Sequence, residues 1–216
     1  MTTLSRLRAQ ISISLDGFVA GPHQSIDNPL GVGGTALHEW VVPLRTFQEQ
    51  HGREGGEDNA STPFLESLLA DIGATIMGRN MFGGHPGDWS HEEPWTGWWG
   101  PRPPFGHPVF VLTHFPREPL ELEGTTFTFV TEGIERALEQ ARAAAGGADV
   151  ALAGGAQAIR QYLAAGLVDE LALNIVPVLL GSGERLFIGS GDDLRGLRVV
   201  ESIATLAVTH LRFARD

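Results

Sequence analysis

The sequence contains neither lysine nor cysteine, and all 15 basic residues among its 216 are arginine. Without lysine the chain cannot form an internal Schiff base, which excludes pyridoxal-phosphate enzymes and lysine-type aldolases, and it cannot be an ordinary P-loop NTPase. Without cysteine it has no thiolate nucleophile, cysteine-ligated zinc, iron–sulfur cluster or disulfide. Any side-chain charge that holds an anionic ligand must therefore come from arginine.

Acidic residues outnumber basic ones by 26 to 15, which gives a net charge of −11. A general nucleic-acid binder would carry a basic stripe, so none is expected as a partner. No apolar run approaches the roughly 18 residues of a membrane span, and the N-terminus lacks the apolar segment of a secretory signal. We therefore expect no membrane association and a cytoplasmic location. The 28 glycines predict tight turns and close approach of the backbone to a ligand.

Alternating strand and helix patterns predict an α/β fold. The expected fold is a three-layer α/β/α sandwich, with a mostly parallel central sheet and an antiparallel C-terminal edge. The length predicts a single domain over 1–216, with loop insertions near 21–35, 51–61 and 83–107. Strands are expected over 8–15, 74–77, 109–112, 126–130, 150–153 and 167–178, helices over 36–50, 62–71, 132–145 and 156–165, and a hairpin over 197–203 and 204–214.

The segment 83–107 has an unusual composition, with four of the five tryptophans and five of the 13 prolines. Loops of this length inside a compact domain are usually lids or binding loops. A self-packed surface loop or a dimer contact would have the same composition. The sequence leaves both interpretations open.

Three expected strands end in residues that suit an anion. Gly154-Gly155-Ala156-Gln157 joins a strand to a helix, whose first N–H groups would face a phosphate. Gly78-Arg79-Asn80 offers a guanidinium, and Thr113-His114 offers a hydroxyl and an imidazole, with Arg117 close by in sequence. Arg79 is the first candidate to hold a phosphate and Arg117 the second. Taken singly, the residues of the three junctions are also those of a tight turn, a surface salt bridge and a solvated strand end. Together they favour a ligand site at the carboxyl edge of the sheet.

Asp16 and His38 are further candidates with two interpretations each. Asp16 ends the first strand, where its carboxylate could face a reaction centre or belong to an ordinary Asp-Gly turn. His38 lies near the start of the helix expected over 36–50, either as a substrate contact or as an exposed residue. The loop histidines show no H-x-x-x-H or H-E-x-x-H spacing, so no metal site is predicted.

Five short motifs occur in an order that resembles the dihydrofolate reductase-like family. The resemblance is greatest to the C-terminal reductase domain of bifunctional riboflavin-biosynthesis deaminase–reductases. It covers nearly the whole chain and is weakest over 21–62 and 83–107. It implies an NADPH-dependent reductase with a central sheet between helices, acting as a homodimer. The motifs are Ile11–Gly17, Ile76–Arg79, Val111–Thr113, Gly154–Ala156 and Pro177–Gly183.

The resemblance also implies roles for individual residues. The Gly-Gly turn would hold the cofactor's pyrophosphate, the other two junctions its adenosine phosphates, and the end of the first strand would lie near the nicotinamide. Asp16 becomes the candidate catalytic residue, and Phe18, His38, Trp98 and Trp99 become candidate substrate contacts. The implied cofactor-binding residues are Ala20, Gly21, Gly78, Arg79, Asn80, Thr113, His114, Gly154, Gly155, Ala156 and Gln157.

Two departures from the resemblance concern the substrate. Met81 stands where dihydrofolate reductases usually have threonine, and their folate-contacting carboxylate aligns ambiguously with Leu37, His38 or Glu39. Folate is therefore not the expected substrate. The expected reaction is hydride transfer from NADPH to a polarised C=N or C=O bond of a small, flat heterocyclic or carbonyl/imine substrate. The alternatives are a non-catalytic NADP(H)-binding or sensor protein, and an interaction protein that uses the tryptophan-rich loop as its interface.

Overall fold

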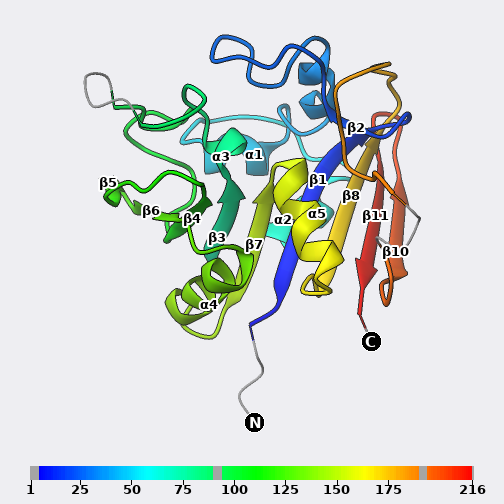
Figure 1. The fold of residues 1–216 in the computed structure, drawn as a ribbon. Helices are drawn as coiled ribbons and strands as arrows, with labels where there is room; N and C mark the ends of the chain where they lie inside the picture. The colour runs from blue at the N-terminus through cyan, green and yellow to red at the C-terminus, as the bar shows by residue number, and fades with distance from the viewer. Residues whose placement is uncertain (1–4, 90–93, 190–193, 216) are drawn as a thin grey trace.

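The computed structural model describes residues 5–89, 94–189 and 194–215. In these ranges nine strands form one sheet in the order β10-β11-β8-β1-β7-β3-β4-β6-β5 (Figure 1). The strands from β8 to β6 run parallel, and β5, β10 and β11 are antiparallel to their neighbours. The sheet strands are β1 Leu7–Ser14, β3 Ile72–Gly78, β4 Val109–Leu112, β5 Leu120–Leu122, β6 Thr125–Val130, β7 Asp149–Gly154, β8 Glu170–Val176, β10 Arg198–Ala204 and β11 Thr209–Ala214.

Helices cover both faces of the sheet, which confirms the predicted fold class. Helices α4 (Ile134–Ala144) and α5 (Ala156–Ala164) lie in front of the sheet in Figure 1, and α1 (Arg45–Gln50) and α2 (Thr62–Leu69) lie behind it. At the top are the short helix α3 (Arg79–Phe82), the 3₁₀ turn η1 (Gly34–His38), and a two-stranded ribbon of β2 (Phe18–Ala20) with β9 (Glu184–Arg185). No helix in the described ranges has the length and apolarity needed to cross a bilayer.

Side chains that alternate along the strands build separate cores on the two faces. Ile76, Phe110 and Val130 belong to the large core that also contains residues of α4 and α5. Their neighbours in the strands, such as Val111 and Phe129, face the other way into a second core rich in aromatic rings. This is the two-residue period of a sheet that is covered on both faces.

The prediction of a single helix over 36–50 is wrong. The chain forms η1, then turns, then the short helix α1. Pro43 has no N–H to donate, and Leu44 adopts an extended conformation that bridges to Glu57. The strands β5 and β9, of three and two residues, were not predicted because such short segments carry no periodic pattern.

A network of buried charges closes the amino end of the sheet. Arg8 and Glu170 are 7% and 8% exposed, and their side chains approach to 3.4 Å. Arg212 donates to the same Glu170 oxygen at 3.1 Å, while Arg8 also donates to the carbonyls of Ser67 and Ala70 at the end of α2. The network therefore joins β1, β8 and β11 to the helix that covers them.

A second polar network, centred on His210 of β11, is buried behind the sheet. The ring is fully buried, with Nδ1 2.7 Å from Oδ1 of Asn174 and Nε2 2.9 Å from the hydroxyl of Ser61. It also stacks on Phe64 with the ring centroids 4.4 Å apart. Both ring nitrogens are satisfied by a neutral imidazole, and burial lowers the pKa of His210 to about 4.

This pKa predicts that the fold loses stability in mild acid. Because the pKa is lower in the folded chain than the ordinary value near 6.5, the contribution is complete above pH 6.5 and is lost as the pH falls toward 4. Between pH 7 and pH 5 we expect a loss of about 2 kcal/mol, measurable by urea unfolding. His210→Gln cannot titrate in this range and should flatten that part of the pH profile. An unchanged slope in the variant would assign the pH dependence to other groups.

Candidate functional site

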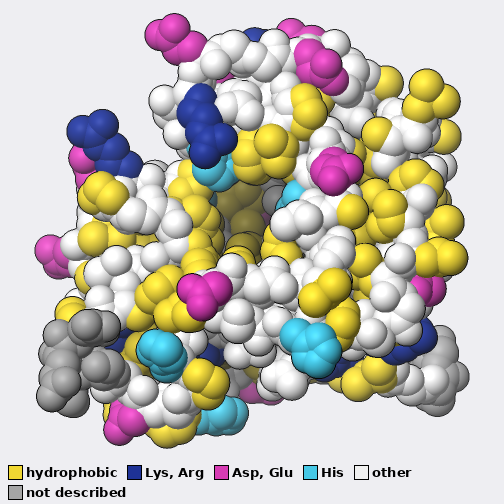
Figure 2. Space-filling view, turned by 90° about the horizontal axis from the view of Figure 1, so that it is seen from above, with side chains coloured by type: hydrophobic (Ala, Val, Ile, Leu, Met, Phe, Trp, Pro, Cys, Tyr) yellow, Lys and Arg dark blue, Asp and Glu magenta, His cyan; other side chains and the backbone are white. Residues whose placement is uncertain are grey.

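The carboxyl ends of four neighbouring parallel strands bring the predicted anion-binding junctions together. β1, β7, β3 and β4 lie side by side, with Met77 paired to Gly154 and Gly78 paired to Leu112. The residues that follow these strands therefore form a row along one edge of the sheet. Figure 2 looks down onto this edge and shows a hollow with largely hydrophobic walls and histidine side chains beside it.

The start of α5 lies open at this edge. Gly155 is its N-terminal capping residue and no side chain caps the helix, so its first N–H groups are available to a ligand. A Cβ added to Gly155 would meet nothing within 4 Å, whereas one added to Gly78 would lie 3.5 Å from the Gly155 nitrogen and from Cβ of Ala158. The two glycine junctions are thus in direct contact, and the space above Gly155 is free. The Gly154–Gly155 peptide bond is cis.

Arg79 and Arg117 converge on the indole of Trp89. The guanidinium carbon of Arg79 lies 3.0 Å from the ring centroid and that of Arg117 lies 4.8 Å away. Arg79 donates to the carbonyl of His85 at 2.7 Å, and Arg117 donates to the carbonyl of Trp95 at 2.6 Å. Nη1 of Arg79 is buried and has no hydrogen-bond partner within the described residues.

The electrostatics of this pair favour an anion. Burial and the neighbouring Arg117 lower the pKa of Arg79 to about 10, and burial lowers the pKa of Arg117. In the part of the chain that the structure describes, no carboxylate forms an ion pair with either side chain. Two adjacent cations with no acidic partner among the described residues, in a chain with a net charge of −11, leave a donor and positive charge available for a phosphate.

The remaining predicted cofactor-binding residues differ in whether their side chains are exposed to a ligand or buried in the fold. Asn80, His114 and Gln157 are exposed. Thr113 is buried, and its hydroxyl accepts a 3.2 Å hydrogen bond from the N–H of Phe115, so it shapes the turn after β4. Ala20 is buried, and Gly21 packs against the backbone of Val32, where a Cβ would clash.

The carboxylate of Asp16 hydrogen-bonds to neighbouring groups of the chain. It accepts hydrogen bonds from the hydroxyl of Ser14 at 2.6 Å and from the N–H groups of Gly181 at 2.7 Å and Leu180 at 3.2 Å. The Ser14 hydroxyl and these N–H groups lower the pKa of Asp16 to about 2. The group stays ionised at neutral pH, so it cannot donate the proton in a reduction. It holds the loop after β8 against the end of β1, and a catalytic role for it stays a prediction.

Phe18 has a neighbour that the sequence did not single out. The guanidinium of Arg185 lies 4.3 Å from the Phe18 ring centroid, and Arg185 also donates to the backbone carbonyl of Asp16 at 3.1 Å. Phe18 itself is buried beneath this cation. Arg185 follows the Pro177–Gly183 motif by two residues, which is the signal in the sequence that could have identified it.

The tryptophans of the segment 83–107 pack against the sheet and against one another, which favours the packing interpretation over the lid. Trp99 contacts Phe105 and Phe127 at centroid distances of 4.9 and 6.1 Å, and Trp98 contacts Trp95 at 4.6 Å. Trp95, Trp99 and Phe105 extend the aromatic core on the face of β3, β4 and β6 opposite α4. Substrate contact by Trp98 and Trp99 stays a prediction.

Trp99→Ala is therefore expected to act mainly on stability. We expect the free energy of unfolding to fall by about 2 kcal/mol, less than the roughly 3–5 kcal/mol of a fully buried ring, because Trp99 is only partly buried. Urea unfolding would measure this loss, and a titration would show unchanged NADPH affinity. A variant with wild-type stability and weakened ligand binding would instead support the lid.

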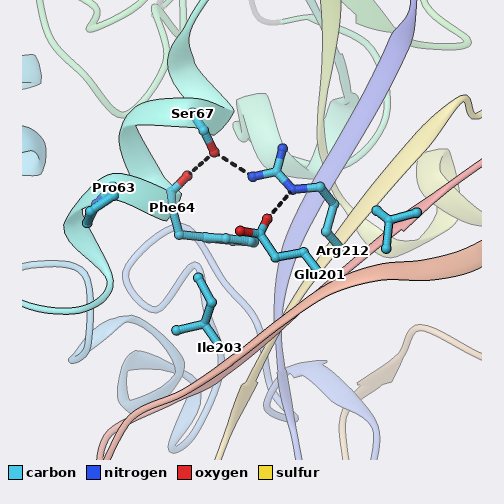
Figure 3. Close-up of a pocket in the computed structure, with 7 residues that line it drawn as sticks. Pro63, Phe64, Ser67, Glu201, Ile203 and Arg212 are labelled. Atoms are coloured by element: carbon cyan, nitrogen blue, oxygen red, sulfur yellow. Dashed lines mark hydrogen bonds and ion pairs between the residues drawn. The ribbon is translucent and has the colours of Figure 1, made fainter.

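A cavity of about 460 Å³ behind the sheet is a weaker candidate site, because its charged side chains are already paired. It lies between α2 and the last two strands (Figure 3), and its charged groups, Arg212 and Glu201, pair with each other at 2.8 Å. Arg212 donates in addition to Ser67 and Glu170, so its guanidinium is already satisfied. The carboxyl edge of the sheet is therefore the better candidate site.

Comparison with known proteins agrees with this fold. The family model described as the RibD C-terminal domain matches residues 6–211, and the chain belongs to this family. An uncharacterized protein of Bacillus subtilis strain 168, YwjB, is 25% identical over 177 residues, which are 82% of this chain and 79% of YwjB.

Solved structures share the fold at low sequence identity. A Shewanella sp. PV-4 protein named for riboflavin biosynthesis gives a TM-score of 0.61 at 21% identity, covering 98% of this chain and 99% of that one. Dihydrofolate reductase from Enterococcus faecalis, complexed with NADP(H), gives 0.55 at 14%, covering 100% and 99%. A Thermotoga maritima deaminase/reductase gives 0.58 at 11%, with 98% of this chain matching 57% of that longer chain. The resemblance seen in the motifs is confirmed at the level of family and fold.

Proposed function

We propose that the protein is an NADPH-dependent reductase that transfers a hydride to a polarised C=N or C=O bond of a small, flat substrate. The supporting observation is the Arg79–Arg117 pair, which has no carboxylate partner among the described residues and lies at the same sheet edge as the uncapped start of α5. The names of the related structures, a reductase and a dihydrofolate reductase with NADP(H), agree with this proposal.

The residues present fit such a cofactor. The N–H groups at the start of α5 would hold the pyrophosphate, because Gly155 leaves the space above them free. Arg79 and Arg117 would hold the adenosine phosphate, for which Nη1 of Arg79 has an unused donor. Asn80, Thr113, His114 and Gln157 would border the adenosine half, and Ala20 and Gly21 the nicotinamide half. When bound, NADPH supplies the hydride.

On the substrate side, the chain provides a mainly apolar cavity. The hydrophobic walls of the hollow in Figure 2 would exclude water from a flat ring placed there. Asp16 would keep the loop at Leu180–Gly181 in place, and as an ion it would not act as the acid. Cytoplasmic action as a homodimer is part of the proposal, and light scattering of the purified chain would test the dimer.

An NADPH titration followed by tryptophan fluorescence tests the proposal, because Trp89 lies under Arg79. We expect saturable binding at micromolar concentrations. Oxidation of NADPH would then be measured with pterins, flavin precursors, quinones and small carbonyl compounds. Binding followed by oxidation with at least one of these supports the reductase. Binding with no oxidation across the panel would favour a sensor, and the absence of binding would reject both functions.

A further inference from the structure

The two-stranded ribbon of β2 and β9 carries the residues proposed to border the nicotinamide. Ala20 of β2 pairs with Glu184 of β9. Gly183, just before β9, packs so closely on this segment that an added Cβ would clash with the carbonyl oxygen of Ala20 and lie 2.9 Å from Cα of Gly21. β2 also packs against η1, which ends at the half-buried His38, and substrate contact by His38 stays a prediction. The position of β9 therefore determines where Ala20 and Gly21 lie.

Arg160 of α5 joins this ribbon to the helix whose start is proposed to hold the pyrophosphate. It lies about one turn after Ala156, the first residue of the helix. Its guanidinium donates from Nη2 to the carboxylate of Glu184 at 2.9 Å and from Nη1 to the backbone carbonyl of Arg185. A single planar group thus spans both residues of β9, and hydrogen bonds from a charged donor hold it in one orientation.

Apolar packing holds the ribbon near α5 independently of this contact. Leu186, which follows β9, is fully buried in the core that also contains Ala156 and Ile159 of α5. Its N–H donates to the carbonyl of Gly17 at 3.2 Å. Loss of the Arg160 side chain should therefore leave the ribbon folded and release only its fixed position along the helix.

We propose that Arg160 is a positioning residue that sets the spacing between the two halves of the dinucleotide site through its contacts with Glu184 and Arg185. This inference rests on the proposed function, because it takes the start of α5 as the pyrophosphate site and Ala20–Gly21 as the border of the nicotinamide. A ligand that binds two linked half-sites gains affinity only while their spacing matches its own length. Loss of the Arg160 contacts should weaken the intact dinucleotide and spare a ligand that occupies one half.

Calorimetric titrations with NADPH and with 2′,5′-ADP, which lacks the nicotinamide half, test the inference. We expect Arg160→Met, which keeps an unbranched stem, to weaken NADPH binding by at least about fivefold and to leave 2′,5′-ADP binding unchanged. Arg160→Lys keeps the charge and one donor, so it should recover part of the NADPH affinity, and it carries the test if the methionine variant does not fold. Arg136→Met is the matched control, because Arg136 pairs with Glu139 on the surface of α4, where the side chains are 50% and 69% exposed. It should bind both ligands as the wild type does.

Variants of Glu184 separate positioning from direct contact with the cofactor. If Arg160 acts through Glu184, Glu184→Ala should weaken NADPH binding about as much as Arg160→Met, and the double variant should lose little more. If Arg160 touched the cofactor itself, Glu184→Ala would leave the NADPH affinity unchanged or raise it, which would overturn the inference.

Equal losses of NADPH and 2′,5′-ADP affinity in variants with a wild-type unfolding midpoint would also overturn it, because they would assign the effect to the charge of Arg160 alone. So would an unchanged NADPH affinity in Arg160→Met. If the wild type binds neither ligand, the reductase proposal itself fails. If it binds both and the Arg160 variants behave as the wild type does, only the positioning role is rejected.

Discussion

Glu170→Ala is expected to lower the free energy of unfolding by about 3–5 kcal/mol, as measured by urea denaturation. Glu170 accepts from Arg8 and Arg212, whose side chains are 7% and 15% exposed. Removing the carboxylate would leave the Arg8 cation buried, and among the described residues its one other acidic partner is the more distant Asp149, at 3.6 Å. Because that charge cannot reach water, the loss should be much larger than that of a surface ion pair.

The Arg102–Glu123 pair provides the control, since it is 2.7 Å long but its side chains are 79% and 66% exposed. Glu123→Ala should change stability by less than about 1 kcal/mol. Similar losses in the two variants would mean that the network at the amino end of the sheet is solvated and is not the anchor that joins β1, β8 and β11 to α2.

Arg79→Ala is expected to weaken NADPH binding by about 10- to 150-fold, the effect of removing a charge-assisted contact worth roughly 1.5–3 kcal/mol. Nη1 of Arg79 is buried without a partner among the described residues and the side chain lies beside Arg117, so a bound phosphate would satisfy a donor and reduce the repulsion between the cations. Affinity would be measured by calorimetry, with the far-ultraviolet spectrum and unfolding midpoint as checks on folding.

Arg102→Ala is the matched control for charge, because it removes an arginine that pairs with Glu123 on the surface. Its NADPH affinity should equal that of the wild type. NADH lacks only the 2′-phosphate on the adenosine ribose, so Arg79→Ala should affect NADH much less than NADPH. An equal loss of affinity for both dinucleotides would mean that Arg79 does not contact this phosphate.

The fold and the row of strand ends were predictable because their signals are local. Gly78 and Gly154 each follow a short apolar strand, and parallel strands place their carboxyl ends on one edge. Arg79 and Arg117 were both expected to supply charge for a phosphate, but their convergence on Trp89 was not predictable, because it depends on how that ring packs between two segments that are far apart in sequence. The same holds for Arg185, which reaches Phe18 only through the β2–β9 ribbon.

The position of the tryptophan-rich segment was open in the sequence, although one clue was present. The strand Val109–Leu112 is apolar on both faces, which requires a cover on each. α4 covers one face, and aromatic residues of 83–107 cover the other. Composition could not distinguish this role from a lid, because tryptophan suits both. The contacts of Trp99 with Phe127 on β6 distinguish them.

Backbone amide shifts in a ¹⁵N-labelled sample titrated with NADPH would show whether the carboxyl edge of the sheet holds the cofactor's phosphates. If it does, we expect the largest shifts at Gly78, Arg79 and Gly155–Gln157, with smaller ones near Thr113. Shifts confined to the cavity lined by Pro63, Phe64 and Arg212, or no shifts at millimolar NADPH, would contradict it.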